Sequence, residues 1–302
     1  MKVTRTYLAM PAHQDRLVAS AARSEADAVF LDLEDAVPES MKAAALTAAI
    51  EALNGLDWGD KVVVVRVNGA GERQRKEIQA LVERCGRLNA VLLPKVESAQ
   101  EIAQVQGQLD GTRIGIEAMI ETAKGLVFCE QIAAAGGNLE SLHFGVGDFG
   151  ASIGAKGVEI GLSDPGYAMT ARATEGYADT PLDMWAYPMM RILVAARAFG
   201  LRAIDGPCGA FRDARLTESS ALKAAALGYD GKQVIHPMQL DSTNRAFTPT
   251  DDEFQAAQRV VAALADAERE GRGAVQLDGK LVDYANIRMA MKVVGMRGRA
   301  GA

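Results

Sequence analysis

The stretch VFLDLEDAVP, from Val29 to Pro38, joins a short apolar run to three carboxylates, Asp32, Glu34 and Asp35. A short, nearly continuous apolar run is typical of a strand buried on both faces of a parallel sheet. Carboxylates gathered where such a strand ends suit a hard divalent cation bound through oxygen, Mg²⁺ above all, with Mn²⁺ as a second option. We therefore asked which polar residues follow the other apolar runs.

Polar or charged groups end six further runs. In chain order they are Arg66 and Asn68, Lys95 and Glu97, Glu121, Asp148, Asp205, and His236. Because the carboxyl ends of parallel strands meet at one edge, we expect these groups to form a ring at a common mouth. Arg66 adds a guanidinium fork that fits a substrate carboxylate or a developing oxyanion. Carboxylates, one metal ion and one arginine indicate a small oxo acid as substrate.

The order of the elements predicts a TIM-type (β/α)₈ barrel. Eight apolar runs alternate with amphipathic helical patterns, as this fold requires. The runs are Thr6–Met10, Ala28–Leu33, Lys61–Val67, Ala90–Val96, Ile114–Glu121, Leu142–Asp148, Leu201–Gly206 and Lys232–Pro237. An open doubly wound sheet is the alternative, but it would more often have a glycine-rich turn after its first strand, and PAHQDR follows here.

The tail has a different pattern, which predicts a catalytic barrel over residues 1–247 and a separate extension over 248–302. A long amphipathic helix begins near Thr248, and a β-hairpin turns at Asp278-Gly279 before a last helix. This helix–hairpin–helix is predicted to be an extension appended to the barrel and not a ninth barrel unit.

Composition excludes several classes of protein. A net charge of -6 and a pI near 5.3 do not suggest binding to nucleic acid or to an anionic membrane. Three widely spaced cysteines form no CxxC pair and no disulfide framework, and no run approaches the length of a membrane span. We expect a cytoplasmic enzyme.

The strand-end motifs resemble those of the citrate lyase β-subunit and malyl-CoA lyase group of the HpcH/HpaI aldolase superfamily. They are FLDLEDAVP, VVRVNG, LLPKVES, MIETAKGL, FGVGDFGASIGA, AIDGP and GKQVIHPMQL, in order along nearly the whole chain. The resemblance implies Mg²⁺ and reversible carbon–carbon cleavage of a β-hydroxyacyl-CoA such as malyl-CoA or citramalyl-CoA. The products would be acetyl-CoA or propionyl-CoA and a small 2-oxo acid.

The resemblance also assigns roles at the mouth. Glu121 and Asp148 would hold the metal, and Arg66 would bind the oxo-acid carboxylate or the thioester oxygen. Glu34 and Asp35 would orient Arg66 and metal-bound water. The alternatives are a structural ion pair between Arg66 and Glu34, and a scaffold role for the two acids.

Two further segments follow from the resemblance. Ile235, His236 and Pro237 correspond to a segment that contacts the CoA adenine, and Asp283 to an acid on a lid reaching over a neighbouring subunit. This implies a homotrimer or hexamer. The alternatives are a hydrogen-bonded loop histidine and an exposed hairpin residue. After the first strand the family usually has Pro-Gly, whereas this chain has Pro-Ala-His at residues 11–13. Whether this loop contacts CoA is therefore not decided by the resemblance.

Three other functions compete with the lyase: a malyl-CoA-type thioesterase, a CoA-independent metal-dependent aldolase on free 2-oxo acids, and a binding module without catalysis. The lid acid disfavours the aldolase, and the paired metal carboxylates disfavour the binding module. The sequence does not decide between lyase and thioesterase, nor which acyl-CoA and oxo acid are used.

Overall fold

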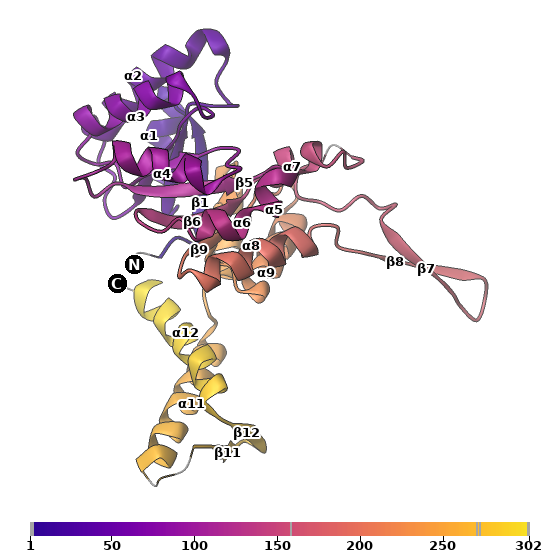
Figure 1. Cartoon of the computed structure of the whole chain (residues 1–302). Coiled ribbons are helices and arrows are strands. Elements are labelled where there is room, and N and C mark those ends of the chain that lie inside the picture. The colour runs from indigo at the N-terminus through magenta and orange to yellow at the C-terminus, as the bar shows by residue number, and fades with distance from the viewer. Residues whose placement is uncertain (1–2, 158, 270, 272, 301–302) are drawn as a thin grey trace. The chain divides into compact units, whose positions relative to one another are not determined.

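Eight parallel strands close into a barrel in the order β1-β10-β9-β6-β5-β4-β3-β2 (Figure 1). The computed structural model describes residues 3–157, 159–269, 271 and 273–300. Residues 298–300 are described by their backbone alone. The barrel strands are β1 (Thr6–Pro11), β2 (Ala28–Asp32), β3 (Val62–Arg66), β4 (Ala90–Leu93), β5 (Gly115–Ile120), β6 (Leu139–Phe144), β9 (Arg202–Asp205) and β10 (Gly231–Val234). The predicted (β/α)₈ barrel is confirmed.

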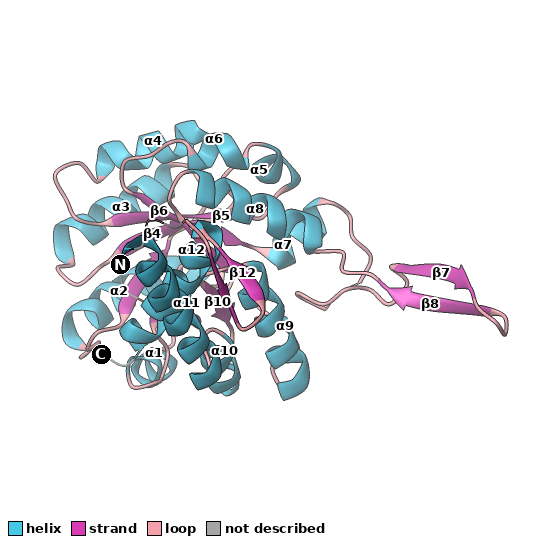
Figure 2. Ribbon diagram, turned by 90° about the horizontal axis from the view of Figure 1, so that it is seen from below, coloured by secondary structure: helices cyan, strands magenta, loops and turns pink. Residues whose placement is uncertain are grey.

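Helices surround the strands, as the view from below shows (Figure 2). They are α1 (Asp15–Ala22), α2 (Lys42–Gly55), α3 (Glu72–Arg84), α4 (Ala99–Gln108), α5 (Ala123–Val127), α6 (Cys129–Ala133), α7 (Val146–Ser152), α8 (Ala186–Ala198), α9 (Ala214–Leu227) and α10 (Leu240–Ala246), with the 3₁₀ turns η1 (Glu39–Met41) and η2 (Pro237–Gln239). Among the described residues no helix is long and apolar enough to span a bilayer.

The barrel interior explains why the strands are continuously apolar. Their side chains are covered by helices on the outside and by one another within, so both faces are buried. The inner cluster comprises Tyr7, Ala28, Phe30, Val62, Val64, Ala90, Leu92, Met119 and Ile204. Register places Asp32 of β2 directly beside Arg66 of β3, which fixes two charged side chains next to each other at the mouth.

Two local differences from the sequence prediction concern the sixth unit. The strand ends at Phe144, and Asp148 lies in the first turn of α7, because Phe149 N–H already donates to Gly145 O. An antiparallel hairpin of β7 (Ala168–Arg172) and β8 (Tyr177–Pro181), which the sequence pattern did not reveal, extends away from the barrel helices in both views.

Residues from Asn244 onward form a second compact unit, separate from Thr4–Thr243. It contains α11 (Asp251–Arg269), the hairpin β11 (Val275–Leu277) and β12 (Lys280–Val282), and α12 (Tyr284–Ala300). The predicted hairpin turn is confirmed, since Asp278 and Gly279 have φ of 49° and 78°, as a two-residue turn of this kind requires. The predicted helix–hairpin–helix is therefore present in this unit.

Candidate active site

A cavity of about 350 Å³ opens at the carboxyl ends of the barrel strands. It is lined by Ala9, Met10, Pro11, Phe30, Asp32, Asp35, Ala36, Arg66, Met119, Glu121, Gly145, Val146, Gly147, Asp148, Ile160, Pro207, Gln233 and Ile235. Of the residues predicted from sequence, the cavity brings together Asp35, Arg66, Glu121, Asp148 and Ile235. Apolar walls around a few charged groups are typical of a small-molecule site.

Glu121 and Asp148 form the acidic side of the cavity. Glu121 follows β5 and is 1% exposed, and its Oε1 accepts a hydrogen bond of 2.8 Å from Lys95 N–H. Burial, together with the charge of Asp148, raises the pKa of Glu121 to about 8. A Cβ on Gly145 would collide with the Glu121 carboxylate, so only glycine admits this close approach.

These two carboxylates fit a hard divalent cation. Two carboxyl groups line the same cavity, and the pKa of Glu121 is raised by burial first and by the charge of Asp148 second, both of which a bound cation would offset. No cluster of three or more His, Cys, Asp or Glu able to hold a metal is found in the described part of the chain. Mg²⁺ suits such a site, because it is commonly held by one or two carboxylates while water and substrate oxygens complete the shell.

Arg66 is fixed mainly by Asp32. Its Nε and Nη2 donate to the two Asp32 carboxylate oxygens at 2.7 and 2.6 Å, whereas Nη1 lies 3.5 Å from Glu34. Burial opposes the charge, but Asp32 outweighs it and raises the pKa of Arg66, so the guanidinium stays charged. Asp32 also accepts from the backbone N–H groups of Glu34 and Ala36 at 2.9 and 3.0 Å.

Sequence reasoning missed this role of Asp32. It assigned the orientation of Arg66 to Glu34 and Asp35, yet in the described structure Asp35 forms no hydrogen bond or ion pair with Arg66, and Glu34 forms only the ion pair at 3.5 Å. The signal in the sequence was that Asp32 and Arg66 are each the penultimate residue of consecutive predicted runs; their pairing itself comes from the strand register. A bidentate pair in that position holds the planar fork in one orientation.

Lys95 connects Glu34 and Asp35 to the acidic side. Its Nζ donates to Glu34 and, at 3.0 Å, to Asp35, and it lies 3.8 Å from Asp148. Burial lowers the pKa of this amine, but the two carboxylates outweigh burial and raise it. A lysine held protonated is a poor Schiff-base nucleophile, so the geometry favours an electrostatic role.

The segment Ile235–Pro237 follows β10. Ile235 and Pro237 are exposed, and the His236 ring stacks on Phe211 at 4.8 Å between centroids. His236 Nδ1 accepts a hydrogen bond from Met238 N–H and so begins η2. A half-buried histidine–aromatic stack of this kind offers a flat surface to a planar ligand.

Asp283 lies in the C-terminal unit and is exposed. Its Oδ1 accepts from Ala285 N–H at 2.8 Å, and Asn286 Oδ1 accepts from Asp283 N–H at 2.9 Å, so Asp283 begins α12. Within the described part of the chain, the second carboxylate oxygen of Asp283 makes no hydrogen bond. Its part in catalysis stays a prediction.

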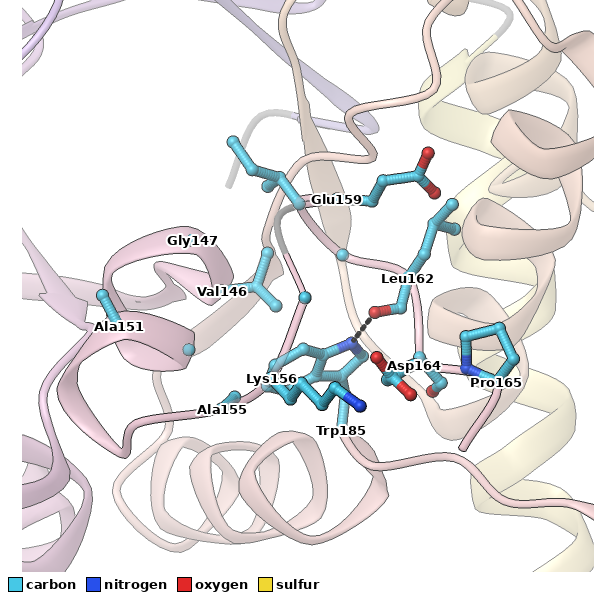
Figure 3. Close-up of a pocket in the computed structure, with 15 residues that line it drawn as sticks. Val146, Gly147, Ala151, Ala155, Lys156, Glu159, Leu162, Asp164, Pro165 and Trp185 are labelled. Carbon is cyan, nitrogen blue, oxygen red and sulfur yellow. Dashed lines mark hydrogen bonds between the residues drawn. The ribbon is translucent and has the colours of Figure 1, made fainter. Parts of the chain in front are cut away.

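A second cavity of about 470 Å³ lies along α7 and the loop after it (Figure 3). It shares Val146, Gly147 and Ile160 with the mouth cavity. Trp185 Nε1 donates to Leu162 O at 3.1 Å and closes its floor. This cavity is the larger, but the buried charged groups gather in the smaller one, so we assign the chemistry to the mouth.

Fold and site together define a class: a (β/α)₈ barrel whose mouth carries a carboxylate pair and a fixed arginine. The family model for HpcH/HpaI aldolase/citrate lyase matches residues 5–237, and the chain belongs to that family.

Named relatives span nearly the whole chain. The L-malyl-CoA/beta-methylmalyl-CoA lyase of Rhodobacter capsulatus is 34% identical over 97% of this chain and 94% of its own. The (3S)-malyl-CoA thioesterase of Cereibacter sphaeroides is 32% identical over 96% and 93%. The crystal structure of CitE from Mycobacterium tuberculosis with magnesium, acetoacetate and coenzyme A has a TM-score of 0.76 at 32% identity, covering 98% of both chains.

Proposed function

We propose that this protein is a Mg²⁺-dependent carbon–carbon lyase that cleaves a β-hydroxyacyl-CoA such as malyl-CoA or citramalyl-CoA. The products are acetyl-CoA or propionyl-CoA and a small 2-oxo acid. The observation that carries the proposal is the convergence of Glu121, Asp148 and Arg66 on one cavity. The family and the lyase relatives support it.

Glu121 and Asp148 are the residues that would hold the ion. When bound, Mg²⁺ supplies Lewis acidity toward the oxygens of a 2-hydroxy or 2-oxo acid. The protein supplies the rest of the environment: the Glu121 carboxylate is kept in place by the Lys95 amide, and apolar walls limit water. Mn²⁺ has the same ligand preference and is a second candidate ion.

Arg66 stabilises negative charge on the substrate. Cleavage converts the acyl fragment into an enolate, whose oxygen needs a donor that is already oriented. The bidentate contact with Asp32 occupies Nε and Nη2, whereas Nη1 has only longer contacts, with Glu34 at 3.5 Å and the Met119 sulfur at 3.9 Å. Nη1 is therefore our candidate donor to this oxygen or to the oxo-acid carboxylate. Asp32 thus orients Arg66, while Glu34 and Asp35 hold Lys95 between them.

The enolate carbon must gain a proton, and Asp283 is our candidate donor. It lies on the C-terminal unit, which we propose closes over the mouth of a neighbouring subunit in a homotrimer or hexamer. Ile235, His236 and Pro237 are proposed to contact the CoA adenine, with the His236–Phe211 stack as the planar surface. The three buried free cysteines and the acidic charge are consistent with a cytoplasmic location.

The test is a panel of CoA thioesters, including malyl-CoA, β-methylmalyl-CoA and citramalyl-CoA, incubated with Mg²⁺ and resolved by mass spectrometry. We expect acetyl-CoA or propionyl-CoA together with a 2-oxo acid. Glu121→Gln and EDTA should each abolish turnover, and Glu72→Gln on exposed α3 should not. Full activity in EDTA would contradict the metal assignment.

The same panel addresses a second candidate function, hydrolysis of the thioester, which the similarity to the malyl-CoA thioesterase favours. Hydrolysis would give free CoA and the intact hydroxy acid, with no 2-oxo acid. Free CoA and malate as the only products would replace the lyase with a thioesterase using the same site.

A further inference from the structure

Gln233 is a polar residue of the cavity wall that the mechanism above does not use. It lies on β10, is 3% exposed, and lines the cavity that contains Arg66, Glu121 and Asp148. Its neighbours in the lining are either charged or apolar, whereas Gln233 carries an uncharged amide. A buried amide in a binding cavity costs free energy unless its hydrogen bonds are made.

One of these hydrogen bonds goes to a buried histidine. Gln233 Nε2 lies 3.1 Å from His143 Nδ1, and the other ring nitrogen, Nε2, lies 3.1 Å from Glu117 Oε2. His143 and Glu117 are fully buried, and the Tyr7 ring packs edge-on against the imidazole at 5.0 Å. Gln233 is therefore attached to a rigid interior network rather than to a mobile loop.

The charge of Glu117 determines which atoms donate and which accept in this hydrogen-bond network. Burial opposes ionisation of Glu117, but the groups around it lower its pKa to about 2. Its Oε1 accepts from Arg202 Nη2 at 2.8 Å and from Tyr7 OH at 2.9 Å, so Glu117 is a carboxylate already paired with a cation, and it only accepts. His143 Nε2 lies 3.1 Å from Glu117 Oε2, which has no regular hydrogen bond in the described structure, and 3.1 Å from Ser141 Oγ, a hydroxyl oxygen that can also accept from it. An unprotonated Nε2 would place two acceptors face to face, so Nε2 carries the hydrogen.

The tautomer of His143 then determines the orientation of the Gln233 side-chain amide. With the hydrogen on Nε2, Nδ1 is a bare acceptor and must receive an N–H from Gln233. The amide cannot turn over without facing oxygen to Nδ1. Gln233 Oε1 makes no hydrogen bond with the described residues and is therefore available to a ligand in the cavity.

We propose that Gln233 is a specificity-determining residue whose amide oxygen favours a substrate with a hydrogen-bond donor at this wall. It disfavours one with a methyl group or a carboxylate there. The inference rests on the proposed function, because it concerns the substituent R of a bound 2-oxo acid, R–CO–COO⁻. A site that accepts from a hydroxyl discriminates against analogues that leave its polar group unpaired.

The binding test uses four 2-oxo acids that differ only in R: glyoxylate, pyruvate, hydroxypyruvate and oxaloacetate. Calorimetric titration with Mg²⁺ present should show tighter binding of hydroxypyruvate than of pyruvate, and weakest binding of oxaloacetate. In Gln233→Met, which removes the amide at similar volume, the ratio of hydroxypyruvate to pyruvate affinity should fall by about 10-fold, as for one lost hydrogen bond. Gln74→Met, which changes a second buried glutamine that lies on α3 outside the cavity lining, should keep the wild-type ratio.

A second readout needs no ligand. The chain has only His13, His143 and His236, so long-range ¹H–¹⁵N spectra, with the first and last removed one at a time, assign the ring of His143. We expect the neutral form with hydrogen on Nε2. An Nδ1–H or doubly protonated ring at the titration pH overturns the inference.

The binding outcomes separate the two proposals. Binding of the four acids with an unchanged affinity ratio in Gln233→Met overturns the role of Gln233 and leaves the lyase proposal intact. Binding of none of them to the Mg²⁺-loaded protein overturns the proposed function, and the role of Gln233 with it.

Discussion

Removing Asp32 should damage the barrel far more than removing Asp35, although both belong to the same three-carboxylate stretch. The Asp32 side chain is 2% exposed, makes both hydrogen bonds to Arg66 and accepts two backbone N–H groups. Asp35 is 55% exposed and pairs with Lys95 at 3.0 Å. The two variants, Asp32→Ala and Asp35→Ala, thus compare a buried pair with a surface pair.

The expected magnitudes differ accordingly. Breaking a buried pair leaves an uncompensated charge and costs about 3–5 kcal/mol, whereas an exposed pair contributes less than about 1 kcal/mol. At about 2–4 °C per kcal/mol for a unit of this size, Asp32→Ala should lower Tm by roughly 10 °C. Asp35→Ala should lower it by no more than about 4 °C. Thermal unfolding followed by circular dichroism measures both.

A third variant tests whether the loss of stability in Asp32→Ala comes from the uncompensated charge of Arg66. Asp32→Ala/Arg66→Met removes the stranded charge together with its partner and should be more stable than Asp32→Ala alone, though inactive. The reasoning would be refuted if Asp32→Ala and Asp35→Ala unfolded within about 1 °C of each other, or if removing Arg66 gave no recovery.

Three further predictions concern catalysis and pH. Arg66→Lys keeps the charge but loses the fork, so kcat/KM for malyl-CoA should fall about 10²-fold, and a near-wild-type value would make Arg66 structural. Asp283→Asn should bind Mg²⁺ and substrate yet be nearly inactive, and mixing it with Arg66→Ala under subunit exchange should restore activity; mixed oligomers without activity would exclude action in trans. The pKa of Glu117 falls to about 2 on folding, so its contribution is complete above about pH 4.3 and is lost as pH falls toward 2. Urea unfolding of Glu117→Gln should therefore show a weaker pH dependence than wild type over that range, and equal slopes would contradict the assignment.

The barrel could be predicted because its signals are local. Each strand is buried on both faces and therefore reads as a short apolar run, and each helix shows one apolar face. The Asp278-Gly279 turn could also be predicted from the sequence, because Asp-Gly is a favoured pair for a two-residue turn in which both residues adopt positive φ. The β7–β8 hairpin was not, because its residues are almost all exposed and carry no burial pattern.

The candidate site was predicted in its members but not in its contacts. Strand-end position put Arg66, Glu121 and Asp148 in a larger predicted ring, and the family resemblance singled out these three, which the structure brings to one cavity. Neither revealed that Asp32, rather than Glu34, fixes Arg66, because that depends on the register of β2 against β3.

The sequence by itself determined which residue types reach the mouth, because strand periodicity and strand ends are properties of consecutive residues. Only the tertiary structure decided which partner each one has. Gln233 lies 90 residues from His143, and Glu121 is 26 residues from the Lys95 amide that holds it. Such pairings follow from barrel closure and register, which bring distant strands together, and no short segment contains that information.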